Sequence, residues 1–276
     1  GAQVNLTRAL ARWPASVIVG AMRWLVALPL LFLPAPVSAE PVCLPAPYAD
    51  AEGEEARYLG GLLSGLRPTL DRHPALAAAL DGLAPALCLA DDMSGAEGYF
   101  DPARMQITLA RGQPAAMHQG VLLHEIRHLE QFSRGFCPSD SLSRDEHTRL
   151  VFALEADASA IALLLAWERL IEGDPAVWEA MMNWPSQTDI AVVLAQEFFR
   201  SGDQATMAAA AFAQWYESAE RRERYYVVAC GAYLERLEIA KALTPTGRLP
   251  DDFLDRLCLL PQGGGYACAE REGGRR

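Results

Sequence analysis

Two histidines four residues apart, with a glutamate directly after the first, form the most distinctive chemical pattern in the chain: His124, Glu125 and His128. Residues i and i+4 lie on one face of an α-helix, about 6 Å apart along its axis, so both imidazoles can reach one metal ion. A glutamate beside the first ligand can hold a metal-bound water and take its proton. The HExxH pattern therefore predicts one zinc ion per chain, held by His124 and His128, with Glu125 as the general base of a hydrolytic reaction.

The third ligand of such a site has to come from elsewhere in the chain, because a catalytic zinc ion usually has three protein ligands and one position for water. The metzincin pattern would place glycine at position 131 and histidine at position 134, where this chain has Gln131 and Arg134, so that class is excluded. Two carboxylates, Glu155 and Asp157, interrupt the apolar run 150–167. A buried carboxylate needs a cation or another partner, and a zinc ion would be one.

Residues i and i+2 of a helix face different directions, so Glu155 and Asp157 cannot easily ligate the same ion. We predict Glu155 as the third ligand and keep Asp157 as the alternative. The carboxylate that does not bind the metal is expected to support the ligands or to pair with Arg127. His147 and Glu146 stay open as further alternatives.

Together these residues resemble the gluzincin class of zinc metallopeptidases, in which HExxH lies on one helix and a glutamate ligand on the next. The pattern HExRHxxQ from His124, followed by ExDA from Glu155, is similar to small, uncharacterised metallopeptidase domains. The resemblance covers residues 86–165 and implies hydrolysis of peptide bonds. The chain departs from gluzincins at Ser159, four residues after Glu155, where they often have an aspartate that orients a zinc-bound imidazole.

The elements that must position these residues are mainly helical. Periodicity, capping residues and breakers predict helices over 52–70, 74–83, 115–132, 143–171 and most of 176–259. Short strands are expected at 86–91 and 105–109, whereas 41–50 is interpreted as a proline-rich leader and 92–98 as a loop. We therefore expect a mainly α (α+β) fold: a zincin-like helical domain with a small β-hairpin or edge strand before the active-site helix. Residues 105–109 would be the edge strand, on which an extended peptide could lie.

The N-terminal residues 1–39 are interpreted as a signal peptide. A short apolar run follows Arg23, and small residues precede a predicted cleavage site after Ala39. Residues 40–276 would then be a single secreted or periplasmic domain with a helical C-terminal half and no stable membrane insertion. The alternative is an uncleaved membrane anchor.

All six cysteines follow the predicted cleavage site, which suggests up to three disulfides in an oxidising compartment. They are Cys43, Cys88, Cys137, Cys230, Cys258 and Cys268. Cys258 and Cys268 flank a glycine-rich turn and are the easiest pair to imagine bridged. Buried free thiols are the alternative.

Composition narrows the class of partner. The chain has 276 residues, 51% of them hydrophobic, and a formal net charge of −11, which favours a globular protein and argues against nucleic acid as a partner. We expect a peptidase acting on a peptide or protein substrate, and the oligomeric state stays open. The alternatives are a hydrolase of another amide, such as cell-wall peptide, and a non-catalytic helical binding module with structural zinc or none.

A few other residues could contribute to such a site. Tyr99, His147, Tyr225 and Tyr226 are candidates for stabilising the oxyanion of a tetrahedral intermediate. His118 lies off the face shared by the two motif histidines and is expected to be polar surface.

Overall fold

The computed structural model describes residues 40–270, apart from Asp50, Asp92, Ser94, Pro138, Asp140 and residues 241–244. The predicted signal peptide and its cleavage after Ala39 lie outside the described residues.

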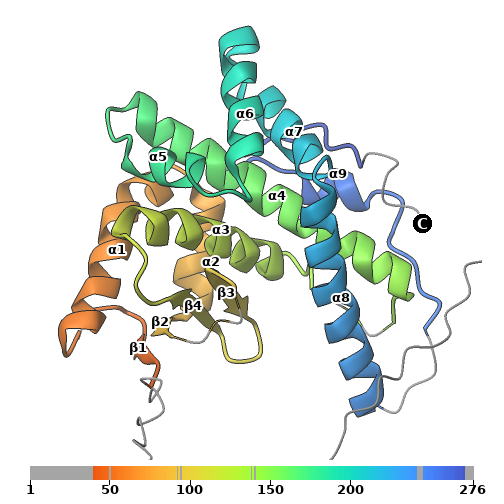
Figure 1. Ribbon diagram of the computed structural model, residues 1–276, viewed down its shortest axis with the longest axis horizontal. Helices are drawn as coiled ribbons and strands as arrows, with labels where there is room; N and C mark the ends of the chain where they lie inside the picture. Colours follow the sequence, from red (N-terminus) through yellow and green to blue (C-terminus); the bar gives the residue numbers. More distant parts are fainter. Residues whose placement is uncertain are drawn as a thin grey trace, which may run out of the picture. The chain divides into compact units, whose positions relative to one another are not determined.

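A four-stranded mixed sheet precedes most of the helices in the chain (Figure 1). Its strands are β1 (Val42–Leu44), β2 (Ala86–Ala90), β3 (Gly98–Asp101) and β4 (Gln106–Ala110), in the spatial order β1-β2-β4-β3. Strands β2 and β4 are parallel, and the two outer pairs are antiparallel. The predicted β-hairpin before the motif helix is therefore confirmed, as β3 and β4.

The prediction that 105–109 is the edge strand is wrong, because β4 lies between β2 and β3 and the edge is β3. Strand β3 was missed because it has only four residues and begins with a glycine, which weakens a strand pattern. The structure explains that glycine: a Cβ at Gly98 would collide with the side chain of Val121 on the helix that packs against this strand. Strand β1 was also missed, because it lies within residues 41–50, which were interpreted as a proline-rich leader.

Nine helices form most of the core within the described part of the chain. They are α1 (Glu54–Asp71), α2 (Pro74–Leu83), α3 (Ala115–Ser133), α4 (Arg144–Ile171), α5 (Ala176–Met182), α6 (Thr188–Ser201), α7 (Gln204–Trp215), α8 (Ala219–Ala240) and α9 (Phe253–Leu257). The fold is mainly helical, as predicted. Figure 1 shows α3 and α4 side by side at the centre, with α3 over the sheet.

Helix α4 is the central helix of the core. Its N-cap is Ser143, whose hydroxyl accepts a hydrogen bond from the backbone N–H of Glu146, as the capping pattern predicted. The helix is long and apolar enough to cross a membrane, but 89% of its most apolar 18-residue stretch is buried inside the protein. There the helix packs against α3, α5, α7 and α8. It is therefore a core helix, and any polar side chain it carries inward has to find a partner.

Two disulfides are present: Cys43–Cys88, which joins β1 to β2, and Cys258–Cys268. The Cys258–Cys268 pairing is confirmed. A third disulfide is not formed among the described residues, since Cys137 is exposed and unpaired and Cys230 is half-buried and unpaired. Two disulfides indicate an oxidising, extracytoplasmic environment.

Candidate metal centre

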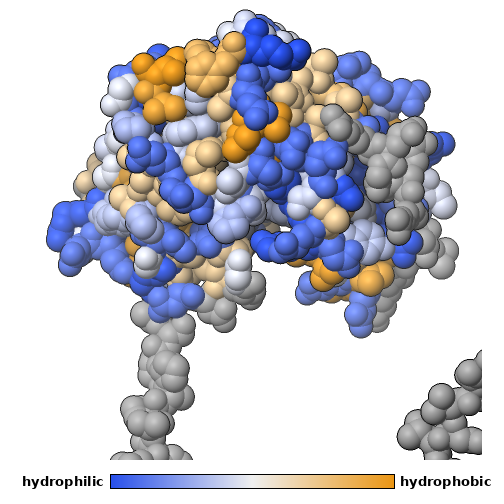
Figure 2. Space-filling model, turned by 45° about the horizontal axis from the view of Figure 1, so that its top comes forward, coloured by the Kyte–Doolittle hydropathy of each residue, from blue (hydrophilic) through white to orange (hydrophobic). Residues whose placement is uncertain are grey.

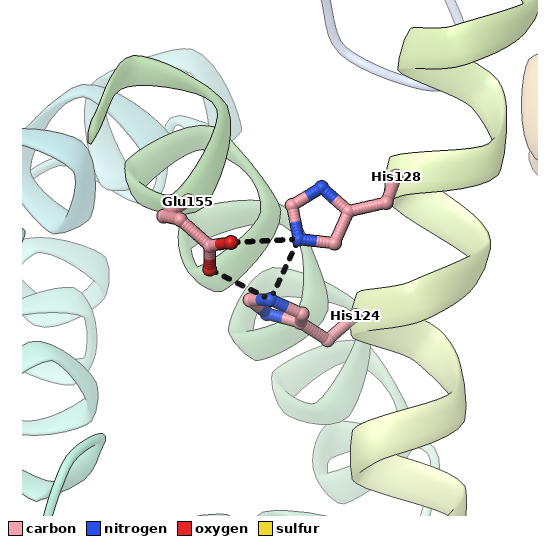
Figure 3. A group of neighbouring side chains, drawn as sticks. All are labelled: His124, His128 and Glu155. Atoms are coloured by element: carbon pink, nitrogen blue, oxygen red, sulfur yellow. Dashed lines mark hydrogen bonds and ion pairs between the residues drawn. The ribbon is translucent and has the colours of Figure 1, made fainter. Parts of the chain in front are cut away.

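Helices α3 and α4 bring two histidines and a carboxylate together (Figure 3). His124 and His128 extend from α3, and Glu155 faces them from α4. The Nε2 atom of His124 lies 3.3 Å from Glu155 Oε2, and the Nε2 atom of His128 lies 3.4 Å from Glu155 Oε1. The two Nε2 atoms are 3.0 Å apart.

These distances fit one tetrahedral metal ion. Bonds of about 2.0–2.2 Å to a tetrahedral zinc ion require ligand atoms about 3.3–3.6 Å apart, close to the separations seen here. Among the described residues, His124, His128 and Glu155 are also the group of metal-binding side chains whose ligand atoms all lie within 4.8 Å of one another. The arrangement is a candidate three-residue metal site with two imidazoles and one carboxylate.

The electrostatics of the cluster depend on burial and on its opposite charges. Burial lowers the pKa of His128, but the charge of Glu155 and its hydrogen bond outweigh burial and raise that pKa to about 9. Burial also favours the neutral form of Glu155, yet the two histidines hold its pKa well below the ordinary range. The carboxylate and His128 therefore form an ion pair when no metal is bound.

Glu125 lies beside the cluster on α3 and is almost completely buried. Burial raises the pKa of its carboxyl group, and the negative charge of Glu155 adds to this, while the two histidines act in the opposite direction. Glu125 lines the same cavity as the histidine pair.

A glutamine fixes the orientation of His128. The Nδ1–H of His128 donates to Gln131 Oε1 at 2.8 Å, and Gln131 Nε2 donates to the backbone carbonyl of Leu154 (3.0 Å) and to Asp157 Oδ2 (2.6 Å). Because both amide hydrogens have acceptors, the amide oxygen has to face the histidine. The proton of the neutral ring is thereby held on Nδ1, and Nε2 is left for a metal.

Asp157 does not face the histidine pair. Its carboxylate pairs with the fully buried Arg127, at 2.7 Å from Nε and 2.9 Å from Nη2, and accepts a 2.5 Å hydrogen bond from the hydroxyl of Tyr266. The structure thus separates the two carboxylates of α4: Glu155 lies at the histidines, and Asp157 is the charge partner of Arg127. The sequence had left this choice open.

The remaining alternatives for the third ligand lie elsewhere. His147 packs against the ring of Tyr233, with ring centroids 5.3 Å apart. Glu146 accepts a hydrogen bond from the backbone N–H of Leu249. Neither belongs to the cluster.

The prediction that His118 is polar surface is wrong. The side chain is buried, with its Nδ1 2.6 Å from the hydroxyl of Tyr58 and its Nε2 2.7 Å from the carbonyl of Ala110. It connects α3 to α1 and to the end of β4. Its role is structural, because both ring nitrogens already have partners.

A cavity of about 950 Å³ opens onto the cluster. Its walls come from the edge strand β3, from α3 and α4, from the segment 184–189 and from α8. Figure 2 shows the surface indented between the sheet and α8. A cavity of this size can hold several residues of an extended chain or a drug-sized ligand.

Helix α8 contributes Tyr225 to this cavity, and Tyr99 of β3 also lines it. Burial raises the pKa of the Tyr225 hydroxyl well above its usual value, and the charge of Glu155 and a hydrogen bond to it add to the shift. Tyr226 is 40% exposed and does not line the cavity. Of the candidate tyrosines, Tyr225 therefore both lines the cavity and interacts with the carboxylate of Glu155.

Comparison with known proteins adds one finding. A family model described as "Putative metallopeptidase family (DUF6782)" matches residues 37–268. Comparisons with curated proteins and with solved structures found no match. The matched region includes the helical C-terminal half, in which the sequence showed no recognisable motif, and it covers well over half of the chain. The chain therefore belongs to the DUF6782 family.

Proposed function

We propose that the protein is an extracytoplasmic zinc peptidase that hydrolyses peptide bonds in a peptide or protein substrate. The observation that carries this proposal is the convergence of His124 Nε2, His128 Nε2 and the Glu155 carboxylate at the inner end of a cavity that Glu125 also lines. Two imidazoles, one carboxylate and a neighbouring glutamate form the ligand and base set of hydrolytic zinc sites. Zinc held there would supply Lewis acidity and a water of lowered pKa.

Glu125 is the proposed general base and then general acid. Its carboxylate would take the proton of the attacking water and later give a proton to the amine that leaves. A pKa raised by burial suits both steps, because a carboxyl group with a higher pKa is a stronger base and still donates near neutral pH.

Tyr225 is the proposed donor to the substrate carbonyl oxygen as negative charge develops on it. Its raised pKa keeps the hydroxyl protonated at neutral pH, so the group can donate a hydrogen bond. In the structure this hydroxyl interacts with Glu155, and it would turn to the substrate when the carboxylate binds the metal.

The substrate is proposed to lie in extended form along β3. No strand pairs with the outer edge of β3 among the described residues, and the residues of this strand line the cavity. The outward-facing backbone groups of an edge strand can accept an added strand, which recognises any extended peptide. The backbone N–H of Phe100 donates to Glu125 and would have to be released for this pairing. This role replaces the one predicted for residues 105–109.

Export through the signal peptide 1–39 is part of the proposal and is supported by the two disulfides. N-terminal sequencing of the exported protein should find Glu40 as the first residue. A mature chain that still carries Arg23 would contradict the cleavage site.

The test of the proposed function combines metal analysis with hydrolysis of a fluorescently labelled, unstructured protein. The wild-type chain should hold about one zinc ion, and chelation should abolish hydrolysis. Glu125→Gln should keep zinc and lower hydrolysis by a factor of about 10²–10⁴. Glu179→Gln, an exposed carboxylate on α5, is the matched control and should leave both unchanged.

Two outcomes would contradict the proposal. A chain with zinc but no hydrolysis of peptide bonds would favour structural zinc or another amide substrate. A chain that binds no zinc would favour a binding module.

A further inference from the structure

We propose that the C-terminal loop, residues 258–268 closed by the Cys258–Cys268 disulfide, sets the metal affinity of the site by positioning His128, and that Tyr266 is the positioning residue. This inference rests on the proposed function, because it concerns the same metal site. It assigns a role to a segment far from the HExxH motif in the sequence.

The C-terminal loop reaches the buried network under the metal site at two points. The Tyr266 hydroxyl donates to Asp157 Oδ1 at 2.5 Å, and Arg127 Nη2 donates to the backbone carbonyl of Leu259 at 2.8 Å. Tyr266 is 7% exposed, and Arg127 and Asp157 are 0% exposed. The hydrogen bond from Tyr266 to Asp157 is therefore shielded from water, where hydrogen bonds are stronger.

The loop is held closed close to both contacts. The backbone N–H of Tyr266 donates to the carbonyl of Cys258 at 3.0 Å, and Leu259 and Gly265 form an isolated antiparallel bridge. The disulfide to Cys268 follows two residues after Tyr266. The hydroxyl of Tyr266 and the carbonyl of Leu259 are thus presented from one small covalently closed unit.

From Asp157 the network continues to the metal ligand. Its two oxygens accept four hydrogen bonds: Oδ1 from Tyr266 and Arg127, and Oδ2 from Arg127 and Gln131. Gln131 is oriented by this carboxylate and in turn accepts the Nδ1–H of His128. If this carboxylate rotates away, the amide of Gln131 keeps only the carbonyl of Leu154 as an acceptor, and the ring of His128 is held less firmly.

The chemistry of metal sites gives the size of the effect. Loss of a group that orients a ligand typically costs about 10–100-fold in metal affinity. Tyr266→Phe removes one of the four donors to Asp157 and keeps the ring in place, so we expect the zinc dissociation constant to rise by about tenfold. Opening the loop by Cys258→Ala together with Cys268→Ala frees both contacts, and the rise should approach about 100-fold.

The second disulfide provides a matched control for a loss of stability alone. Cys43–Cys88 joins β1 to β2, and no hydrogen bond or ion pair described above links this pair to the network. The two cysteines of this disulfide are 45 residues apart in the sequence, whereas Cys258 and Cys268 are 10 residues apart. Since a disulfide that closes a longer segment restricts the unfolded chain more, removing Cys43–Cys88 should lower the melting temperature at least as much.

The experiment measures zinc affinity by competition with a chromophoric chelator on the full oxidised chain, together with thermal unfolding and the visible absorption of the Co²⁺-loaded protein. Wild type, Tyr266→Phe, the double variant at Cys258 and Cys268 and the double variant at Cys43 and Cys88 are compared. We expect weaker zinc binding and an altered cobalt spectrum only in Tyr266→Phe and in the double variant at Cys258 and Cys268. The control should melt earlier but bind zinc within about twofold of wild type.

Two results would overturn the inference while leaving the peptidase proposal intact. One is unchanged zinc affinity in both Tyr266→Phe and the loop variant. The other is an equal loss of affinity in the Cys43 and Cys88 control, which would assign the effect to general stability. Absence of zinc binding by the wild-type chain would overturn the proposed function and this inference together.

Discussion

Arg127 and Asp157 form a buried ion pair between α3 and α4, with 2.7 Å between Arg127 Nε and Asp157 Oδ2. The pair explains why two carboxylates occur so close together on an apolar helix. Asp157 pairs with the arginine that the motif carries into the core, which Glu130 also contacts at 2.9 Å from Nη1. Glu155, two residues before Asp157, faces the histidines. The roles of the two carboxylates can therefore be separated by substitution.

We predict that Glu155→Ala and Asp157→Asn fail in different ways. Glu155→Ala removes the proposed third ligand and leaves two histidines, which cannot hold zinc tightly, so metal should be lost. The metal-free variant should also lose the stabilisation that the ion pair of Glu155 with His128 provides. Asp157→Asn removes one of the two carboxylates that pair with the buried Arg127, the other being Glu130, and should cost about 1–3 kcal/mol of stability, with a decrease of about 10–100-fold in zinc affinity. Elemental analysis after dialysis and thermal unfolding measure both effects. Full zinc in Glu155→Ala together with its loss in Asp157→Asn would reverse the assignment.

Tyr225→Phe should lower the turnover number by about 100-fold or more and leave zinc content unchanged, because the lost hydroxyl would act on the developing oxyanion. Steady-state hydrolysis of a fluorogenic peptide measures this effect. Tyr226→Phe is the matched control: the neighbouring tyrosine lies outside the cavity, and its substitution should not change the turnover number. Equal activity of both variants would exclude Tyr225 from the reaction.

Thiol titration of the denatured, unreduced protein should find two thiols per chain. The structure leaves Cys137 and Cys230 unpaired, and in the folded protein the exposed Cys137 should react before the half-buried Cys230. Peptide mapping identifies the labelled residues. Six thiols would contradict both disulfides and the extracytoplasmic environment, and none would indicate a further disulfide.

Local patterns in the sequence predicted the elements that hold the motif. The expected helix 115–132 is α3 (Ala115–Ser133), and the helix that the cap at Ser143 predicted ends at Ile171 in the structure as well. Helical periodicity, caps and breakers act within a few residues, so a single sequence contains this information. The convergence of the two histidines follows from helix geometry, which places residues i and i+4 on the same face.

The parts of the site that were missed depend on contacts between distant residues. Tyr266 lies 109 residues from Asp157, and no spacing rule connects a tyrosine in a C-terminal loop to a carboxylate on the central helix. Tyr225 was one of several candidates, and only the packing of α8 places it at the cavity. In the sequence, Gln131 only helped to exclude the metzincin pattern, whereas in the structure its contact with His128 orients the imidazole ring. Such roles come from tertiary packing, which overrides local pattern.

The stability of the metal-free protein should fall as the pH rises through about 9, and the zinc-loaded protein should not show this loss. The pKa of His128 is raised to about 9 in the folded metal-free chain, against an ordinary value near 6.5 in the unfolded chain. The folded state therefore binds this proton more tightly. The stabilisation it provides is fully present below about pH 6.5 and is lost as the pH rises through about 9. Zinc needs the neutral imidazole, so in the loaded protein the proton has already been displaced.

Urea unfolding between pH 6 and pH 9.5, with chelator or with zinc, measures the difference between the two states. His128→Asn in chelator is the control, because it removes the titrating group and should remove most of the pH dependence in this range. Glu155 contributes in the opposite direction: its lowered pKa stabilises the folded state above about pH 4.5, and this contribution is lost only as the pH falls. A loss of stability at acidic pH is therefore distinct from the predicted loss of stability as the pH rises through about 9. Identical pH profiles with and without zinc would show that the metal displaces no proton from His128, which would contradict the raised pKa of His128 in the metal-free protein.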